Sequence, residues 1–363
     1  MIENARRPIF SPIIGCAFTL LSVIASQQTA IGSPAGHGLW EMDNLVAWGV
    51  VPFDAKQRSP EERAQMLERL GFKHFAYSWR DKHIQSFDAE IEALKRHHID
   101  LLAWALYGSD NPNLGTILET FRRHGVHPQL WVMQPSSSDT PEEWARLLPK
   151  EMRIPETEEE QAKLSEREKK ALRDVSLRVQ RDDFPKSAQA QRLRVELEAD
   201  RINSLVKLAA PLGVKVELYN HNGWFGTMSN EVAIIQRLKA LGVGDVGIVY
   251  NFSHARDAMH DDTADFAKIW RQIQPYTAAV NVTGTYMDGT VIYPSQGDRE
   301  FEMMRVIEDS GWKGRIGVIA EAGGDAEATL KNSIRGLHWL AAELAQPGSG
   351  GPRPFAVVPQ GSF

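Results

Sequence analysis

The sequence predicts an α/β fold, a (β/α)8 TIM barrel, and three observations support this prediction. Short runs rich in β-branched and aromatic residues alternate with longer segments of helical periodicity over most of the chain. The helical segments carry start and stop signals, such as Ser59 and Pro60 before an acidic turn, with a glycine at the far end. Polar side chains gather where several later strands end, which is typical of a barrel with its site at the carboxyl ends of its strands.

The predicted strands and helices follow one another from residue 44 to residue 344. The strand-like runs cover residues 44–53, 73–79, 100–108, 128–135, 214–219, 245–251, 278–282 and 314–320. The helical segments cover residues 59–72, 87–99, 114–126, 190–214, 231–243, 265–273, 299–312 and 327–344. Because strands that alternate with helices of this length form βα units, we expect a parallel sheet that closes into one barrel over residues 38–346.

Two segments depart from this alternation. Residues 136–195, after the fourth strand, are dense in charge and poor in large apolar residues. We expect a solvated helical insertion there. A lid or docking arm over the site is the alternative, since the segment follows the carboxyl end of a strand. Residues 347–363 are rich in glycine and proline and are expected to form an irregular tail.

Residues 1–35 have the pattern of a signal peptide. Arg6 and Arg7 precede an apolar run over residues 13–25, which is too short to span a bilayer comfortably, and small and polar residues follow. The pattern predicts export to the periplasm or the extracellular medium, with no membrane attachment after cleavage. An uncleaved membrane anchor is the alternative. Cys16 is the only cysteine, so the cleaved chain would contain none and its fold would not depend on redox conditions.

The composition argues against nucleic acid as a partner. The hydrophobic fraction of 42% and the charged fraction of 24% are typical of a soluble globular protein. The formal net charge is −6, and no basic patch stands out in the sequence. Both features disfavour an endonuclease-like activity, because binding to a phosphate backbone depends on lysine and arginine. The composition leaves open whether the protein forms an oligomer.

Polar residues follow three of the later predicted strands at equivalent places. Asn220 and His221 come directly after the strand at 214–219. The strand at 245–251 ends in Asn251, with His254 three residues later. Asn281 lies at the end of the strand at 278–282, and Thr283 follows. Because the carboxyl ends of parallel barrel strands meet on one face, we expect these side chains to converge.

The last four predicted strands resemble the xylose-isomerase-like barrels, the sugar isomerase and epimerase superfamily with its endonuclease IV relatives. The motifs that carry the resemblance are YNHNGWFG (219–226), YNFSHA (250–255), VNVTGT (280–285), YPSQGDREF (293–301) and GVIAEAGG (317–324). Such barrels bind one divalent metal through a carboxylate, an aspartate, a histidine and a second carboxylate at those four strand ends. The resemblance therefore implies a metal-dependent step on a sugar.

This chain departs from the metal-binding pattern at three of the four strand ends. Tyr219 stands where the first carboxylate is expected, Asn251 replaces the aspartate, and Asn281 replaces the histidine. Glu321 matches the last ligand, and Glu217 lies two residues before Tyr219 on the same side of an ideal strand. Two interpretations stay open: a metal-free site, or one ion of Mn²⁺, Mg²⁺ or Zn²⁺. The candidate ligands for an ion are Glu217, His221, His254 and Glu321.

The resemblance and the strand ends together predict an exported carbohydrate-active enzyme of sugar isomerase or epimerase type, with a keto-sugar or keto-glycoside lyase as a variant. Its step is proton abstraction next to a carbonyl, which needs a base. The candidate bases are Glu321, His254 and Glu217, and the candidate substrate-binding residues are Arg80, Asn220, His221, Trp224, Asn251 and Asn281. The alternative is a barrel without catalysis that binds a sugar or a partner protein.

Each of these residues also has a plain structural interpretation. Asn251 and Asn281 suit loop capping, and Arg80 suits a solvated surface. Glu217 suits a carboxylate at the bottom of the barrel. Packing within the barrel would explain any one of four tryptophans, although several at one rim would suit a sugar ring. The four are Trp79, Trp104, Trp131 and Trp224.

Overall fold

The computed structural model describes most of the chain from residue 38 onward. The described residues are 38–134, 162–170, 188–221, 223–254, 265–284, 291–297, 299–320 and 324–356. By its internal contacts the chain divides into a unit of residues Met1–Ala30 and a unit of residues Ile31–Phe363, and all described residues belong to the second unit. The predicted signal peptide and Glu321 therefore lie outside the described residues.

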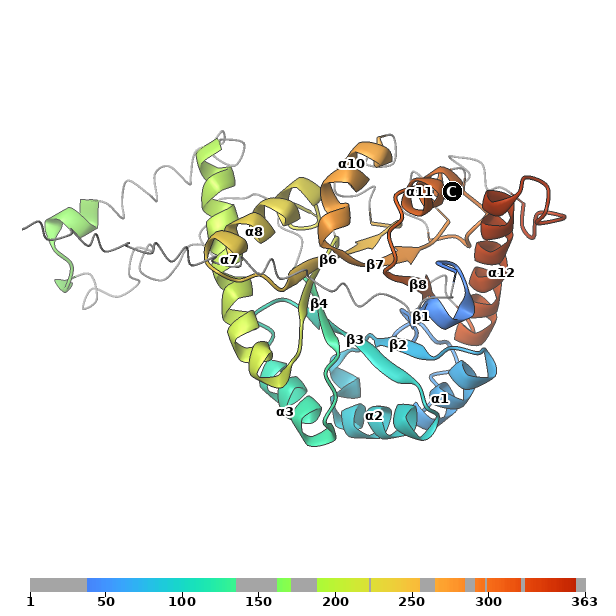
Figure 1. Ribbon diagram of the computed structural model, residues 1–363. Coiled ribbons are helices and arrows are strands. Elements are labelled where there is room, and N and C mark those ends of the chain that lie inside the picture. Colours follow the sequence, from blue (N-terminus) through green and yellow to red (C-terminus); the bar gives the residue numbers. More distant parts are fainter. Residues whose placement is uncertain are drawn as a thin grey trace, which may run out of the picture. The chain divides into compact units, whose positions relative to one another are not determined.

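Eight strands close into a parallel barrel, which confirms the predicted fold class (Figure 1). Each strand pairs in parallel with its neighbours in chain order, and β8 pairs with β1 to close the ring. The strands are β1 (Leu45–Trp48), β2 (His74–Tyr77), β3 (Asp100–Tyr107), β4 (Gln129–Met133), β5 (Val216–Tyr219), β6 (Val246–Asn251), β7 (Thr277–Val282) and β8 (Arg315–Ile319).

Helices surround the barrel and lie close to the bounds that the sequence predicts (Figure 1). They are α1 (Pro60–Arg69), α2 (Phe87–Arg96), α3 (Leu114–His124), α7 (Ala188–Ala209), α8 (Met228–Ala240), α10 (Phe266–Ile273), α11 (Glu300–Asp309) and α12 (Ala326–Ala345). Short 3-10 helices are η1 (Met42–Asn44), η2 (Asp81–Ser86), η5 (Ala210–Leu212) and η6 (Gln274–Tyr276). None of the helices in the described ranges is long and apolar enough to cross a membrane.

Local sequence signals set the ends of these helices. At the start of α1, the Ser59 hydroxyl accepts a hydrogen bond from the Glu62 backbone N–H, and the Glu62 carboxylate accepts one from the Ser59 N–H. This reciprocal capping box satisfies two of the backbone donors that a helix start leaves unpaired. At the end of α3, Gly125 adopts the left-handed conformation with φ 59°, which ends the helix without the cost of a side chain.

The apolar core has two layers. The larger layer lies between the strands and the surrounding helices. The smaller layer fills the barrel interior, where the large rings of Trp48, Trp131 and Tyr219 lie among the small side chains of Ala103 and Ala105. Trp48 and Trp131 contact edge to face with 5.0 Å between ring centroids. The interior is therefore a packed core and not a pore.

The predicted charged insertion is described only in part. Residues 162–170 include a helical turn at 166–170 and are mostly exposed. Helix α7 begins at Ala188, inside the range predicted for the insertion. At the other end of the chain, α12 ends at Ala345 and residues 347–356 form turns and irregular structure.

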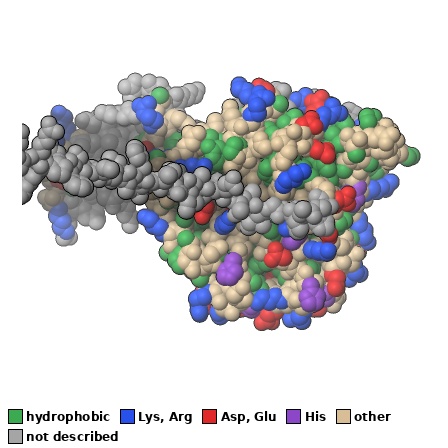
Figure 2. Space-filling model, in the orientation of Figure 1, with side chains coloured by type: hydrophobic (Ala, Val, Ile, Leu, Met, Phe, Trp, Pro, Cys, Tyr) green, Lys and Arg blue, Asp and Glu red, His purple; other side chains and the backbone are tan. Residues whose placement is uncertain are grey.

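Figure 2 shows lysine and arginine interspersed with aspartate and glutamate over the visible face.

Candidate functional site

A tyrosine hydroxyl forms the centre of the polar site inside the barrel. The Tyr219 oxygen, at the end of β5, accepts hydrogen bonds from Trp48 Nε1 at 3.0 Å, Asn251 Nδ2 at 2.5 Å and Asn281 Nδ2 at 3.3 Å. The three donors come from β1, β6 and β7, and all four side chains are buried. We call these four side chains the Tyr219 network.

The orientation of the Asn251 amide follows from its other contacts. Its Oδ1 accepts hydrogen bonds from the Ser253 backbone N–H at 3.0 Å and from the Ser253 hydroxyl at 2.9 Å. A backbone N–H can only donate, so the amide oxygen must face Ser253. The NH₂ group is then the part that faces Tyr219.

Asn281 occupies space that a glycine leaves open on the neighbouring strand. A Cβ atom at Gly317 of β8 would lie 1.7 Å from Asn281 Oδ1. Within the part of the chain that the structure describes, this oxygen has no hydrogen-bond partner. Gly317 is therefore needed for the position that Asn281 takes in the Tyr219 network.

The structure brings His221 and His254 together beside this network. Their ring centroids are 4.7 Å apart, and the His254 ring lies 5.8 Å from the Tyr219 ring. Both histidines are half-buried, and they follow β5 and β6. The His254 backbone N–H donates to the Asn251 carbonyl at 3.2 Å, which holds the imidazole close to the amide that contacts Tyr219.

Asn220 holds two strand tips together. Its Oδ1 accepts from the Asn251 backbone N–H at 2.7 Å, and its Nδ2 donates to the Asn251 carbonyl at 3.1 Å. The Asn220 side chain thus makes the two hydrogen bonds that one further pair of backbone residues between β5 and β6 would make. Both of its polar ends are used in this pairing, so the structure gives Asn220 a supporting place under the site.

Trp224 and Arg80 lie at the rim, on different sides of the barrel. Trp224 donates from Nε1 to Gln191 Oε1 of α7 at 2.7 Å, and the Arg194 guanidinium lies 4.7 Å from its ring. Arg80 donates from Nη1 to the Trp79 carbonyl at 2.8 Å and to the Tyr107 hydroxyl at 2.7 Å. Its guanidinium also lies 5.1 Å from the centre of the Tyr107 ring.

Arg80 borders a pocket of about 490 Å³, which we call the rim pocket. The residues that line it are Trp79, Arg80, Asp81, Lys82, Tyr107 and Asn111. Tyr107 ends β3 and also packs against the barrel interior, so it connects the rim pocket with the inner cluster around Trp48 and Tyr219.

Glu217 lies deeper in the barrel than the histidines. Its carboxylate occupies the space over Gly247, where an added Cβ would lie 2.2 Å from Oε2. Burial raises the pKa of Glu217 to about 8, against the lowering effects of Lys215 and of a hydrogen bond from the Gly247 backbone. Gly247 is four residues before Asn251 on β6, about 13 Å at 3.3 Å per residue. The structure therefore does not bring Glu217 together with His254.

Three of the four candidate tryptophans serve packing. Trp79 and Trp104 are buried between the barrel and its helices, and the Trp79 ring N–H donates to the Ala105 carbonyl at 2.7 Å. Trp131 lies inside the barrel and donates to Gln129 Oε1 at 2.9 Å. The sequence analysis did not single out Trp48 or Tyr107. The available signal for Trp48 was the run VAWG, in which a strand ends in tryptophan before a glycine.

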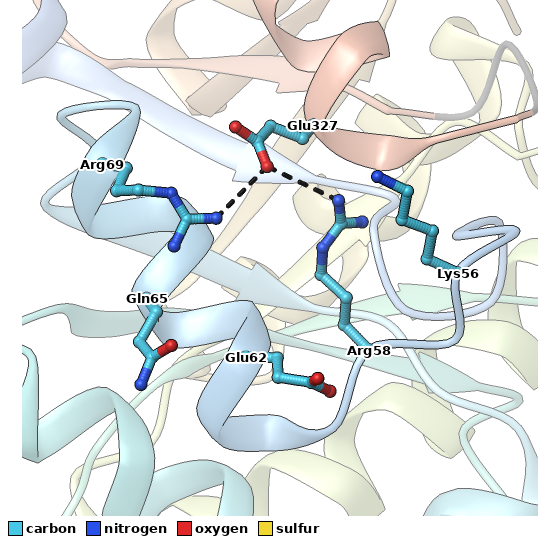
Figure 3. Close-up of a pocket in the computed structure, with 6 residues that line it drawn as sticks. All are labelled: Lys56, Arg58, Glu62, Gln65, Arg69 and Glu327. Atoms are coloured by element: carbon cyan, nitrogen blue, oxygen red, sulfur yellow. Dashed lines mark hydrogen bonds and ion pairs between the residues drawn. The ribbon is translucent and has the colours of Figure 1, made fainter.

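A second hollow, of about 510 Å³, lies on the outside between α1 and the start of α12 (Figure 3). Each of its cations is paired with a carboxylate. Arg58 contacts Asp325 at 2.6 Å, Arg69 contacts Glu327 at 3.2 Å, and Lys56 contacts Asp325 at 2.8 Å. We assign this hollow to the ion pairs that connect the first and last βα units.

Solved structures with the same fold include several xylose-isomerase-like barrels. The 3-keto-D-glucoside 4-epimerase YcjR from E. coli has 14% identity, with 82% of this chain and 99% of that chain covered and a TM-score of 0.52. The IolI protein with a bound zinc atom has 13% identity, with coverage of 83% and 99% and a TM-score of 0.56. A family 2 AP endonuclease from Brucella melitensis has 12% identity, with coverage of 80% and 97% and a TM-score of 0.52.

At these identities the likeness establishes a shared fold, which confirms the resemblance to xylose-isomerase-like barrels at the level of architecture. No family model and no curated protein sequence matches the chain.

The Tyr219 network itself offers no ligand to a divalent cation, and the imidazoles of His221 and His254 are the candidate ligands beside it. A hard cation needs ligand oxygens or imidazole nitrogens turned toward it. Here three N–H groups face the Tyr219 oxygen, and the Asn251 oxygen is turned away toward Ser253. Among the described residues, no three His, Cys, Asp or Glu side chains are placed to share an ion. The candidate ligand Glu321 lies outside that set.

Proposed function

We propose that this protein is a carbohydrate-active enzyme of sugar isomerase or epimerase type. The observation that carries the proposal is the pair of imidazoles, His221 and His254, which meet beside a polar network at the carboxyl ends of barrel strands. Imidazole exchanges protons readily near neutral pH, which suits it to acid and base roles. The fold shared with a 3-keto-D-glucoside 4-epimerase supports a keto-sugar as the substrate class.

The proposed step is proton transfer next to a carbonyl. One imidazole removes the proton from the carbon beside the carbonyl, and the C–H electron pair moves onto the carbonyl oxygen to give an enediolate. Return of the proton to the former carbonyl carbon, with transfer of the adjacent hydroxyl proton to the former carbonyl oxygen, gives the isomer. Return of the proton to the opposite face of the carbon that lost it gives the epimer. In the lyase variant, the enediolate instead expels an oxygen substituent from the next carbon, and the substituent leaves with the proton that the imidazole has taken up.

The rim pocket gives the rest of the sugar a place to bind. Arg80 is held between the rings of Phe53 and Tyr107 and by its hydrogen bond to the Tyr107 hydroxyl. A guanidinium fixed in this way presents directed donors at little entropic cost. We propose that Arg80 and Asn111 contact the hydroxyl groups or the carboxylate of the sugar at the end away from the histidines.

Proton exchange with solvent tests the function directly. The full-length protein is incubated in D₂O with ketohexoses and 3-keto-glucosides, and NMR follows deuterium uptake next to the carbonyl. We expect uptake with at least one substrate, and a loss of about 100-fold or more in His254→Gln or His221→Gln, the range typical of a general acid or base. The matched control is His124→Gln at the last residue of α3, which should keep the full rate. Equal rates in all variants would contradict the proposal.

A barrel that binds sugar without catalysis is the second candidate. Its supporting observation is that β5, β6 and β7 end in Tyr219, Asn251 and Asn281, so these strand ends carry none of the ligands that the resemblance implies. Saturation-transfer NMR with the same sugars separates the two candidates. Binding without deuterium uptake in any sugar would favour the non-catalytic barrel.

We also propose that the protein is exported. The basic start at Arg6 and Arg7 and the apolar run over residues 13–25 support this location. Amino-terminal sequencing of the protein from the extracellular or periplasmic fraction should show a start after residue 25. An intact chain recovered from the membrane fraction would support the uncleaved anchor.

A further inference from the structure

One side of α7 contacts the segments that follow β4 and β5. Gln191, Arg194 and Glu198 are spaced three and four residues apart, so their side chains lie on one side of the helix. Gln191 and Arg194 contact Trp224 in the loop after β5. Glu198 accepts a hydrogen bond from Gln134, directly after β4, at 3.0 Å. We call Gln191, Arg194 and Glu198 the α7 face.

Three hydrogen bonds form a closed cycle between α7, the loop after β5 and the first turn of α8. Trp224 donates from Nε1 to Gln191 Oε1, Gln191 donates from Nε2 to Asn230 Oδ1, and Asn230 donates from Nδ2 to the Trp224 carbonyl, each at 2.7 Å. An indole N–H can only donate, so the Gln191 oxygen must face Trp224 and its NH₂ group must face Asn230. We call these three bonds the Gln191 cycle, and the direction of each bond in it is fixed.

The loop that the Gln191 cycle holds carries His221. Residues 223–227 fold back, and the Thr227 backbone N–H donates to the Trp224 carbonyl at 3.3 Å. Gly226 lies against the His221 backbone, because an added Cβ at Gly226 would lie 1.4 Å from the His221 carbonyl oxygen. A shift of Trp224 is therefore transmitted through Gly226 to the backbone that carries the His221 imidazole.

The other end of the α7 face is fixed by buried contacts. Glu198 is buried, and its second carboxylate oxygen accepts a hydrogen bond from Arg201 at 3.0 Å. Gln134 donates to the Ser109 hydroxyl at 2.8 Å and accepts from the Ser109 backbone N–H at 3.1 Å. Gln134 follows β4 and Ser109 follows β3, so α7 is joined to two strand ends. The helix is therefore a fixed support from which Gln191 can hold Trp224.

We propose that the α7 face positions the His221 imidazole for proton transfer, with Gln191 as the residue that makes the decisive contact. This inference rests on the proposed function, in which His221 and His254 carry the proton transfer. Gln191, Trp224 and Asn230 are positioning residues that act through His221, and the indole N–H of Trp224 is used by Gln191 and not by a sugar. Proton transfer depends strongly on the placement of the base, so a looser loop lowers kcat more than it weakens substrate binding.

The NMR signals of His221 test the positioning without any substrate. Full-length protein is labelled with ¹⁵N-histidine, and His221→Gln identifies the ring signals of His221. Gln191→Glu has the same shape and still accepts from Trp224, but its carboxylate has no hydrogen to donate to Asn230, so the cycle is broken. We expect the His221 ring signals to shift or broaden in Gln191→Glu and in Gln191→Ala. Unchanged His221 signals in both variants would overturn the proposal.

Two comparisons show that the effect is specific. Gln236→Ala, at an exposed position of α8, is the matched control and should leave the His221 signals as in wild type. The His124 signals, from the end of α3, should be the same in every variant. Equal changes at His221 and His124 would show that the Gln191 variants disturb the whole fold, which would contradict a local positioning role.

Kinetics on any sugar that exchanges its proton give the second measurement. Gln191→Ala should lower kcat about tenfold or more and leave KM within about twofold, whereas Gln236→Ala should match wild type. Asn230→Ala breaks the same cycle, so the double variant with Gln191→Ala should lose little more than the larger single loss. A higher KM with unchanged kcat, or single losses that multiply in the double variant, would overturn the proposal. If no sugar exchanges its proton, the proposed function fails, while the NMR measurement still decides whether the α7 face positions His221.

Discussion

Two glutamates, one on β5 and one on α8, are buried without the usual partners for a charge. Burial raises the pKa of Glu217 to about 8 and raises the pKa of Glu231, in the first turn of α8, well above its ordinary value. Neither carboxylate oxygen of Glu231 has a hydrogen-bond partner among the described residues. Both groups therefore hold a proton in the folded protein under conditions where the unfolded chain releases it.

Glu217→Gln should remove part of the pH dependence of stability. The folded pKa of about 8 lies above the ordinary value of 4.5, so the favourable contribution is complete below pH 4.5 and is lost as the pH rises toward 8. At about 1.4 kcal/mol per unit, the loss is on the order of 5 kcal/mol. Urea unfolding at pH 5 and pH 9 should show wild type weakened at pH 9 and the variant much less so.

Glu92→Gln is the matched control, because Glu92 is exposed on α2. It should keep the wild-type difference in the free energy of unfolding between the two pH values. An equal difference in Glu217→Gln and in wild type would show that Glu217 is solvated or paired in solution.

At the residue scale, the sequence predicts which side chains reach the site but not which polar atoms remain for a substrate. His221, Asn251 and Asn281 reach the carboxyl ends of their strands, as strand period and barrel topology require. Asn220 reaches the same end, but both of its polar groups pair with the Asn251 backbone. Such a pairing depends on the neighbouring strand 31 residues away, which local sequence does not contain.

At the scale of single elements, helix ends were predictable because their signals are local. The capping box at Ser59 and the left-handed Gly125 both lie within a few residues of the helix that they end. The first strand was predicted over residues 44–53, yet β1 ends at Trp48, because Gly49 takes a positive φ of 66°. Val50 and Val51, in the connection between β1 and α1, are still buried. Apolar composition alone therefore does not separate a strand from a buried loop.

Gly317→Ala tests how much the packing of Asn281 on β7 against Gly317 on β8 contributes to stability. The added methyl group would lie 1.7 Å from Asn281 Oδ1, so the buried amide must turn away from Tyr219. We expect a loss of about 1 to 3 kcal/mol in the free energy of unfolding, as for other overpacked cores. Combining it with Asn281→Ala should recover most of the loss, because the clash is then absent. Urea unfolding of the single and double variants measures this coupling.

Gly115→Ala in α3 is the matched control for that substitution. A Cβ at this position meets no atom within 4 Å, so the free energy of unfolding should change by about 0.5 kcal/mol or less. A Gly317→Ala variant as stable as this control would show that Asn281 does not occupy the space over Gly317.

At the scale of the whole molecule, the barrel is closed by strand pairing and by ion pairs. β1 pairs with β8 through four residues, from Leu45 with Ile316 to Trp48 with Ile319. Outside the sheet, Arg58 contacts Asp54 at 2.7 Å and Asp325 at 2.6 Å, which connects the loop after β1 with the start of α12. Alternating strands and helices predict eight units, but they do not reveal an ion pair between residues 267 positions apart.

Arg58→Met should weaken this closure more than an ordinary surface change does. The Arg58 side chain is only 8% exposed and that of Asp54 is fully buried. Burial tends to raise the pKa of Asp54, but hydrogen bonds from Arg58 and from the Ala326 backbone hold it below its ordinary value, so the carboxylate is charged at neutral pH. Removal of Arg58 leaves that charge without its cation, and we expect a loss of about 3 kcal/mol or more in the free energy of unfolding at pH 7.

Two further variants show whether the loss comes from the buried charge. Arg122→Met removes an exposed arginine that pairs with Glu119 within α3, and a change of less than about 1 kcal/mol is expected, as for other surface pairs. Adding Asp54→Asn to Arg58→Met should restore part of the stability, because no uncompensated carboxylate then remains in the closure. Urea unfolding at pH 7 measures all of these variants. If Arg58→Met were as stable as Arg122→Met, the first and last βα units would be held by β1–β8 pairing and apolar packing alone.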